Sequence, residues 1–295
     1  MSLEEVAVCP VCDKDTFRHH LTCKDHTSSG ELFHVKQCEV CSLVLTSPRP
    51  SALQAGRYYQ SEEYISHTSS SRGILGSIYL IVRYFTMIWK FNLVKNHLKG
   101  GPLLDFGSGT GRFLQYCKSK GIPVHGVEPS PEARKNTNAD LDIADSLTHL
   151  PPLQFDVITL WHVLEHVYTL KETLEALRSR LSEDGTIFIA VPNWKSSDAT
   201  HYKESWAAYD VPRHLWHFSK DSIPSLLNRS GLSIKEVLPM KLDAYYVSLL
   251  SEKYQRHGTL GVTGLLYGIY AGVRSNLRAK TDGHYSSLIY VVKKK

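Results

Sequence analysis

The sequence predicts an α/β fold with a doubly wound parallel sheet, preceded by a small cysteine-rich module. From residue 103 onward, short apolar runs alternate with helical patterns, as expected for parallel strands joined by right-handed helical crossovers. Four of the six cysteines form two closely spaced pairs near the N-terminus. With 295 residues, 42% of them hydrophobic, the chain is long enough for one large core and an appended module.

Seven short apolar runs are expected as strands. Five of them form the parallel part of the sheet: Leu103–Phe106, Val124–Val127, Leu141–Ala144, Phe155–Leu160 and Thr186–Val191. Two later runs, Leu232–Leu238 and Ser286–Val292, would add edge strands. In such sheets ligands bind at the carboxyl ends of the parallel strands.

Helices are expected between these strands. One begins near Phe113, and Ser130-Pro131-Glu132 is typical of a second helix start. A third helix is indicated by leucines spaced four, three and four residues apart, and Gly185 is expected to end it. These leucines are Leu170, Leu174, Leu177 and Leu181. The apolar segment 74–98 is expected to form further helices that cover the core.

Charge and hydropathy disfavour several classes of protein. The formal net charge is +5, from 34 basic against 29 acidic residues that are spread along the chain, which gives little support for nucleic-acid binding. The first twenty residues lack the apolar stretch of an export signal, so we expect a cytoplasmic location. The apolar segments 74–98 and 260–273 are interrupted by charges or too short to cross a bilayer, so no transmembrane segment is expected.

The paired cysteines predict a metal site. Cys9 and Cys12 form one Cys-x2-Cys pair, and Cys38 and Cys41 form the other, separated by 25 residues, which is the arrangement of a zinc ribbon. Four thiolates occupy all four coordination positions of a tetrahedral ion, so the Zn²⁺ would be structural and not catalytic. The alternatives are that these cysteines pack in a core, or that Cys23 or His26 replaces one ligand.

A glycine-rich turn follows the first predicted strand. Gly107, Gly109 and Gly111 lie between the strand and the next helix, where a ligand can approach the backbone closely. Glu128 ends the following strand, 21 residues after Gly107, where a carboxylate can bind both hydroxyls of a ribose. A dinucleotide-binding fingerprint would have glycine or alanine where Arg112 stands, which disfavours a nicotinamide cofactor. That cofactor is kept as the alternative, together with a glycine turn that binds no ligand.

These residues resemble motif I of the class I S-adenosylmethionine-dependent methyltransferases. Phe155–His166 resembles the fourth-strand segment of that family, and the resemblance covers roughly residues 100–195. It implies a Rossmann-like, seven-stranded sheet and S-adenosyl-L-methionine as the cofactor. By this resemblance, three groups of residues surround the cofactor. Asp105 and Gly107–Gly111, including Ser108, face the methionine, Glu128 faces the ribose, Asp145 and Ser146 face the adenine, and Trp161 and His162 face the sulfonium.

The cysteine pairs followed by this domain resemble a bacterial subgroup that includes sugar C-methyltransferases. Three parts are therefore expected: a zinc-ribbon module in residues 1–50, a helical linker that covers the cofactor in residues 51–99, and the methyltransferase domain in residues 100–295. Tyr58, Tyr59, Tyr64 and His67 either close over the cofactor or pack the domain junction. Residues 241–285 form an insertion that is interpreted as a lid over the acceptor, with an ordinary packing helix as the alternative.

The loop after Pro192 is rich in polar and aromatic side chains and is interpreted as the acceptor site. The sugar C-methyltransferases have a His-Glu-His-Leu run here, and only its second histidine is matched, by His214. His214 is the expected general base because a histidine titrates near neutrality. The further catalytic candidates are His217, Asp210 and His162, and Arg213 would suit an anionic acceptor. The alternative is that His214 and His217 cap a helix or pair with Asp210.

Two more residues of the fourth-strand segment, Glu165 and His166, are candidate bases or close the strand structurally. The favoured function is methyl transfer to a small-molecule acceptor: a sugar, a glycan precursor or a secondary metabolite. An RNA methyltransferase that reads RNA through the ribbon is disfavoured, because residues 1–50 carry five basic residues against seven acidic ones. A third possibility is a cofactor-binding protein without catalysis, in which the ribbon docks a partner protein.

Overall fold

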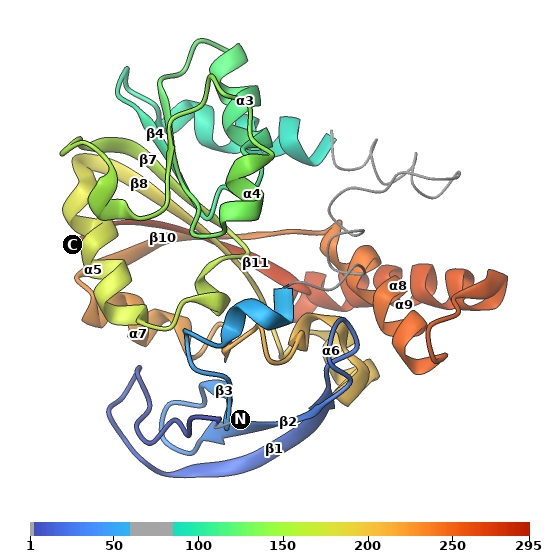
Figure 1. The fold of residues 1–295 in the computed structure, drawn as a ribbon. Helices are drawn as coiled ribbons and strands as arrows, with labels where there is room; N and C mark the ends of the chain where they lie inside the picture. The colour runs from blue at the N-terminus through green and yellow to red at the C-terminus, as the bar shows by residue number, and fades with distance from the viewer. Residues whose placement is uncertain (1–2, 60–84) are drawn as a thin grey trace.

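The structure is a computed structural model that describes residues 3–59 and 85–295. These residues form two sheets (Figure 1). The larger sheet has seven strands in the order β10-β11-β8-β7-β4-β5-β6, and the smaller has four in the order β1-β2-β3-β9. The predicted seven-stranded α/β architecture is confirmed.

The strands of the larger sheet follow the predicted runs closely. They are β4 (Leu103–Phe106), β5 (Val124–Val127), β6 (Ile143–Ala144), β7 (Phe155–Trp161), β8 (Leu181–Pro192), β10 (Leu232–Pro239) and β11 (Ser287–Lys294). The first five are parallel, and β11 runs antiparallel to both of its neighbours. Of the two later strands, only β10 lies at an edge of the sheet. The prediction that β11 also lies at an edge is wrong, because its side chains from Ser287 to Val292 are all buried, as in an internal strand.

Helices cover both faces of this sheet. Residues 85–94 and α3 (Arg112–Ser119) pack on one face against Leu103 and Val157. The helices α5 (Leu170–Arg180) and α7 (Ile223–Arg229) pack on the other face against Leu104 and Ile158. Successive strand residues thus point to opposite cores, which is the double winding expected from the alternation of strands and helices. The remaining helix of this part is α4 (Pro131–Lys135), and Ser130 caps it as predicted.

One predicted helix boundary is wrong. The helix α5 ends at Arg180, and Leu181 is already extended and begins β8, paired with Phe155 of β7. Gly185 therefore lies within a strand and does not end the helix. All four leucines of the predicted apolar face are nevertheless buried, because Leu181 reaches the same core from the strand.

The cysteine segment shares a sheet and a core with the rest of the chain. Its strands β1 (Phe17–Lys24), β2 (Leu32–Cys38) and β3 (Val44–Thr46) are continued by β9 (Trp216–His217), from the far side of the sequence. Cys9 and Cys38 pack in the same core as α5 and α7. Residues 1–50 thus do not pack as an isolated unit, and their status as a separate domain stays a prediction.

The insertion between β10 and β11 is a helical hairpin that projects from the body of the molecule (Figure 1). Its helices are α8 (Asp243–Gln255) and α9 (Gly261–Asp282). They approach closely at Gly268, where an added Cβ would lie 2.8 Å from the side chain of Leu249. Among the described residues, every helix is too short or too polar to cross a membrane.

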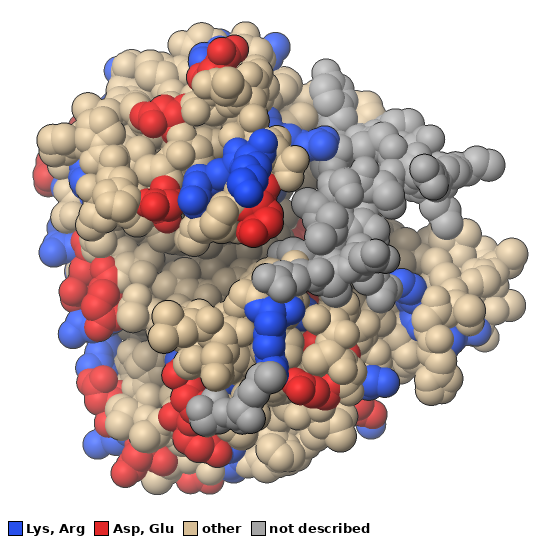
Figure 2. All heavy atoms as spheres, in the orientation of Figure 1, with Lys and Arg blue, Asp and Glu red and all other residues tan. Residues whose placement is uncertain are grey.

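Short helical turns complete the described chain. They are η1 (Ala55–Tyr59), η2 (Lys95–His97), η3 (Leu147–His149), η4 (Leu164–His166), α6 (Ser197–Tyr202), η5 (Lys203–Ser205) and η6 (Ala207–Tyr209). The face drawn in Figure 2 is hollowed between the part that carries the seven-stranded sheet and the part that carries the cysteine segment. Acidic and basic side chains alternate on this face without a broad patch of either sign.

Candidate active site

The glycine loop forms a tight turn at the carboxyl end of β4. Gly107 has a φ of +77°, and a Cβ at this position would lie 2.4 Å from the side chain of Val163. Gly111 has a φ of +71° and precedes the first residue of α3. Both positions require glycine, since other residues rarely adopt positive φ values. The predicted sequence of strand, glycine turn and helix is present.

Glu128 joins this loop from the neighbouring strand. Its Oε2 accepts a hydrogen bond of 2.8 Å from the Gly109 N–H, and its Oε1 accepts one of 2.8 Å from the Ser130 N–H. Each carboxylate oxygen has two lone pairs, so both oxygens can still accept a hydrogen bond from a ligand. The carboxylate is thus held at the ends of two adjacent parallel strands in a position suited to a ribose diol.

Asp105 lies at the base of the site and is buried. The Thr159 hydroxyl donates a hydrogen bond of 2.6 Å to its Oδ1. Burial raises the pKa of Asp105 to about 7, although Thr159 and the nearby Lys90 ammonium act in the opposite direction. Lys90 comes from the helix of residues 85–94, and its Nζ lies 4.5 Å from the ring centroid of Trp161. This lysine is a site residue that sequence reasoning missed.

Two polar atoms near the glycine loop are buried without hydrogen-bond partners. They are the Ser108 Oγ and the Trp161 Nε1, both of which belong to predicted cofactor-binding residues. A bound polar ligand would satisfy such atoms, so the residues present fit a cofactor here. Asp145 and Ser146 follow β6, and the Asp145 carboxylate is partly exposed and paired with His149. Their contact with an adenine stays a prediction.

His162 is held between two carboxylates. Its Nε2 lies 2.9 Å from Asp243 Oδ2, at the start of α8, and its Nδ1 lies 3.4 Å from Glu165 Oε1. Burial lowers the pKa of His162, but the Asp243 and Glu165 carboxylates outweigh it and raise the pKa to about 10. A histidine that keeps its proton at neutral pH cannot serve as a general base. The structure therefore argues against that role for His162.

Asp210 and Arg213 have structural roles. The Arg213 side chain is completely buried and donates hydrogen bonds of 2.6 Å to Asp210 and 2.9 Å to Asp25. A third bond, of 3.1 Å, reaches the backbone carbonyl of Tyr58. The proposed contact of Arg213 with an anionic acceptor is wrong, because none of this side chain is exposed. Asp210 is likewise occupied by the arginine and is a poor candidate for catalysis.

His217 is also part of the framework. It lies in β9, and its Nε2 is 3.1 Å from the Thr46 Oγ1, which itself donates to the His214 carbonyl. Burial lowers the pKa of His217 well below its ordinary value, so the ring is neutral. Its contact with Thr46 joins β9 to β3 within the smaller sheet. His217 therefore has a structural role here, and a catalytic role for it stays a prediction.

His214, the predicted base, lies next to two residues of the fourth-strand segment. The ring centroids of His214 and His166 are 4.6 Å apart, and ligand atoms of Glu165, His166 and His214 all lie within 4.8 Å of one another. The Nδ1 of His214 donates a hydrogen bond of 2.8 Å to the Ala208 carbonyl. Its Nε2 is therefore left with a lone pair. Burial lowers the pKa of His166 to about 4, so the His166 ring is neutral at pH 7.

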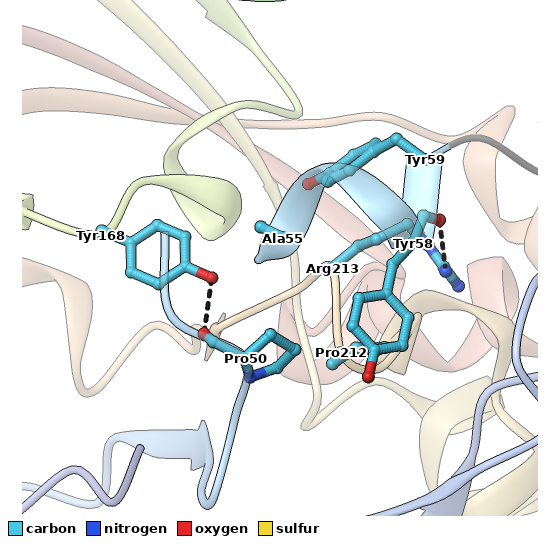
Figure 3. Close-up of a pocket in the computed structure, with 7 residues that line it drawn as sticks. All are labelled: Pro50, Ala55, Tyr58, Tyr59, Tyr168, Pro212 and Arg213. Atoms are coloured by element: carbon cyan, nitrogen blue, oxygen red, sulfur yellow. Dashed lines mark hydrogen bonds between the residues drawn. The ribbon is translucent and has the colours of Figure 1, made fainter. Parts of the chain in front are cut away.

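Two of the predicted aromatic residues line a small cavity beside this cluster (Figure 3). Tyr58 and Tyr59 lie on one side and Tyr168 on the other, where the Tyr168 hydroxyl donates a hydrogen bond of 2.8 Å to the Pro50 carbonyl. The cavity volume is about 10 Å³, which is room for roughly one water molecule. It is therefore not an acceptor pocket. Tyr64 and His67 lie outside the described residues.

The four paired cysteines converge as predicted. The Cys9 and Cys41 sulfurs are 3.4 Å apart, and the Cys12 and Cys38 sulfurs are 3.5 Å apart. Around a tetrahedral ion with bonds of about 2.3 Å, sulfur atoms are roughly 3.8 Å apart, so a small expansion accommodates Zn²⁺. The hydrogen bond with Cys41 and burial raise the pKa of the Cys9 thiol, which means that a cation is needed to stabilise the thiolates. Cys23 packs elsewhere in a second core.

The residues that sequence reasoning missed come from distant parts of the chain. Asp25 pairs with Arg213, Asp243 pairs with His162, and Lys90 faces Trp161. None of them belongs to a local motif, and a single sequence carries no signal for such long-range pairs. Only the folded chain brings them together.

A doubly wound sheet with a glycine loop and a carboxylate at the ends of adjacent strands defines a class of α/β proteins that bind nucleoside-containing cofactors there. Within that class, a family model described as a methyltransferase domain matches residues 86–237, just over half of the chain. The chain therefore belongs to this methyltransferase family. The prediction of a class I S-adenosylmethionine-dependent methyltransferase domain is confirmed.

Curated relatives are more distant. The chain is 29% identical over 108 residues to the ubiquinone biosynthesis O-methyltransferase of Paraburkholderia phymatum, a match that covers 33% of this chain and 47% of that protein. It is 27% identical over 146 residues to the protein of the same name from Azoarcus sp., covering 45% of this chain and 62% of that protein. The chain thus spans about half the length of the curated relatives it matches.

A solved structure supports the fold alone. It is assigned as a sarcosine dimethylglycine methyltransferase from Galdieria sulphuraria, and it superposes with a TM-score of 0.50 at 11% sequence identity. The match covers 73% of this chain and 86% of the other. At this identity it carries no information about the acceptor.

Proposed function

We propose that this protein transfers a methyl group from S-adenosyl-L-methionine to a hydroxyl group of a small-molecule acceptor such as a sugar, a glycan precursor or a secondary metabolite. The observation that carries the proposal is the contact between the glycine loop and Glu128 at the ends of β4 and β5. Transfer to oxygen is supported by the names of the curated relatives, which are O-methyltransferases.

The chain's own residues would bind the cofactor in three places. Glu128 accepts hydrogen bonds from the ribose hydroxyls, the Gly107–Gly111 loop allows close approach to the backbone, and the buried Ser108 hydroxyl gains a partner. When bound, the cofactor supplies a methyl group activated by a positively charged sulfur. Lys90 and protonated His162 lie near the same strand ends and balance the buried Asp105 and Glu165 carboxylates and the partly exposed Asp243 carboxylate.

Methyl transfer to a hydroxyl requires removal of one proton. The acceptor oxygen forms a bond to the methyl carbon, the carbon–sulfur bond breaks with its electron pair left on sulfur, and the hydroxyl proton passes to the protein. Of the predicted catalytic residues, His214 lies beside His166 of the fourth-strand segment, and its Nδ1 donates to the Ala208 carbonyl, which leaves Nε2 as the nitrogen that can take a proton. We therefore assign proton removal at this position to the His214 Nε2 in the metal-free protein, with Glu165 and His166 as its neighbours.

We further propose that the paired cysteines hold one structural Zn²⁺. The ion would join the loop around Cys9 and Cys12 to the loop around Cys38 and Cys41, both of which pack against the main core. Arg229 of α7 donates a hydrogen bond of 2.8 Å to the Val11 carbonyl, between the first two cysteines. Loss of the ion should therefore loosen the smaller sheet and, through β9, the acceptor loop.

No described feature favours the RNA methyltransferase alternative. The face drawn in Figure 2 has acidic and basic groups interspersed, whereas RNA binding needs a basic surface with exposed aromatic rings. A cofactor-binding protein without catalysis has the same cofactor site. A measurement of methyl-transfer turnover distinguishes this alternative from an enzyme, whereas a measurement of cofactor affinity does not.

Isothermal titration calorimetry with S-adenosylmethionine tests the cofactor proposal. The wild type should bind, Glu128→Ala should bind at least tenfold more weakly, and Glu132→Ala should match the wild type, because Glu132 is exposed on α4. An acceptor screen with nucleotide sugars and phenols would follow. If the folded wild type shows no heat with S-adenosylmethionine, the proposal is wrong.

A further inference from the structure

We propose that Glu165, His166 and His214 bind a divalent metal ion that holds the acceptor oxygen, as a second site distinct from the four cysteines. Ligand atoms of these three residues lie within 4.8 Å of one another. Around one ion with bonds of about 2.1 Å, ligand atoms are roughly 3.0–3.5 Å apart, so closure of the site needs movements of about 1 Å. The role assigned to this ion rests on the proposed function, whereas the choice of its three ligands does not.

Both histidines present the correct nitrogen. The Nδ1 of His214 donates to the Ala208 carbonyl at 2.8 Å. The Nδ1 of His166 donates to the Arg213 carbonyl at 3.0 Å and also lies 3.1 Å from the Tyr59 hydroxyl. Each ring therefore keeps its lone pair on Nε2. Metal-binding histidines characteristically donate their second ring N–H to a backbone carbonyl or carboxylate, which fixes the tautomer and the orientation of the ring. Here this outer layer of contacts is already in place.

Glu165 provides the second, independent observation. Its side chain is completely buried, yet neither of its carboxylate oxygens accepts a hydrogen bond. The nearest basic group, the His162 ring, has its Nδ1 3.4 Å from Oε1, without hydrogen-bond geometry. A buried carboxylate without hydrogen bonds is costly and needs an explanation. A metal ion bound between Glu165 and the two histidines supplies one.

The ligand set defines the kind of ion and what it can hold. Two imidazoles and one carboxylate suit Zn²⁺, Fe²⁺ or Co²⁺, and three protein ligands leave coordination positions open. Glu165 is buried, but His166 is only half-buried, so the open positions would face the His166 side. An acceptor hydroxyl bound there would lose its proton to water more readily, because the ion stabilises the oxygen anion and the three ligands would no longer need to take the proton themselves. The acceptor class is thus a hydroxyl compound whose oxygen can ligate a metal.

Metal titration of the full chain tests this site. Protein with its ribbon loaded with Zn²⁺ is titrated with Co²⁺, followed by visible absorption and by elemental analysis. The wild type and His149→Gln, an exposed histidine remote from the cluster, should bind one Co²⁺ per chain with the d–d bands of a nitrogen and oxygen site. Glu165→Gln and His214→Gln should each bind it at least tenfold more weakly. S-adenosylmethionine affinity, measured in parallel, reports whether each variant is folded.

Each outcome decides the matter. Absence of a second Co²⁺ in the wild type, or equal Co²⁺ affinity in all four proteins, overturns the inference. If Glu165→Gln fails to fold, His166→Gln at the half-buried position takes its place in the comparison. A wild type that binds the second ion but not S-adenosylmethionine would retain the site and reject the proposed function. A wild type that methylates an acceptor equally well with only the ribbon ion would reject the role assigned to the second ion.

Discussion

Replacement of Arg213 by methionine should destabilise the protein severely. The arginine side chain and its partner Asp25 are both fully buried, and Asp210 is the second partner. Removal of one partner from a buried ion pair typically costs about 3–5 kcal/mol, because the remaining charge stays buried without compensation. Two carboxylates lose their cation here. We therefore expect a loss of about 4 kcal/mol in the free energy of unfolding, which corresponds to a decrease in Tm of roughly 8–16 °C.

The deficit should depend on pH. Arg213 lowers the pKa values of Asp25 and Asp210 against the effect of burial, so in the wild type their contribution to stability is present above their ordinary pKa and is lost as the pH falls through the lowered values. Without the arginine, burial should raise both pKa values. The carboxyl groups of Arg213→Met then become protonated in mild acid, and the difference from the wild type should shrink between pH 7 and pH 5.

Urea denaturation followed by circular dichroism at both pH values measures these effects. Arg278→Met is the matched control, because Arg278 and its partner Asp282 are both exposed and 4.0 Å apart, a pair worth less than about 1 kcal/mol. A loss below 1 kcal/mol in Arg213→Met would refute the reasoning. So would a normal stability accompanied by a selective loss of acceptor binding, which would restore Arg213 as a substrate ligand.

Three further predictions concern the cofactor, the zinc ion and a buried acid. Glu128→Ala should weaken S-adenosylmethionine binding by 10- to 100-fold in calorimetry, the loss expected for hydrogen bonds to a charged group, and an unchanged Kd would contradict the ribose assignment. Cys38→Ser should abolish stoichiometric zinc by elemental analysis and lower the Tm, and zinc retained at one ion per chain would count against the ribbon. Because burial raises the pKa of Asp105 to about 7, its contribution to stability is full below its unfolded pKa near 4 and is lost as the pH rises through 7. Denaturation curves should therefore show the wild type losing roughly 3–4 kcal/mol relative to Asp105→Asn between pH 4 and pH 8, and parallel pH profiles would show that Asp105 is not the group responsible.

The contacts of the loop after Pro192 explain why the cysteine segment and the methyltransferase domain form one structure. Arg213 binds Asp25 of the cysteine segment, and Thr46 of β3 binds both the His214 carbonyl and the His217 ring. The same loop therefore carries the predicted base and the contacts that join the two sheets. Perturbation of the zinc site should reach His214 through β3 and β9, without any direct contact between the two.

The local features of the chain were predictable because local interactions determine them. The glycine turn, Glu128 at the end of β5 and the cap of α4 at Ser130 all depend on residues close together in the sequence. The two cysteine pairs were also recognisable, since their short spacing is sufficient to present two thiolates each. The apolar runs predicted the strands. The spacing of apolar residues along a helix or strand reflects whether that element is buried on one face or on both.

By itself, the amino-acid sequence determined the fold class, the order of strands and helices, the glycine loop with Glu128 and the convergence of the four paired cysteines. Only the tertiary structure decided which polar residues of the loop after Pro192 are available for chemistry. Asp210, Arg213 and His217 resembled site residues but are committed to buried partners, whereas Glu165 and His166 join His214. The physical reason is that the state of a polar group depends on its burial and on partners up to about 190 positions away, as in the pair of Arg213 and Asp25.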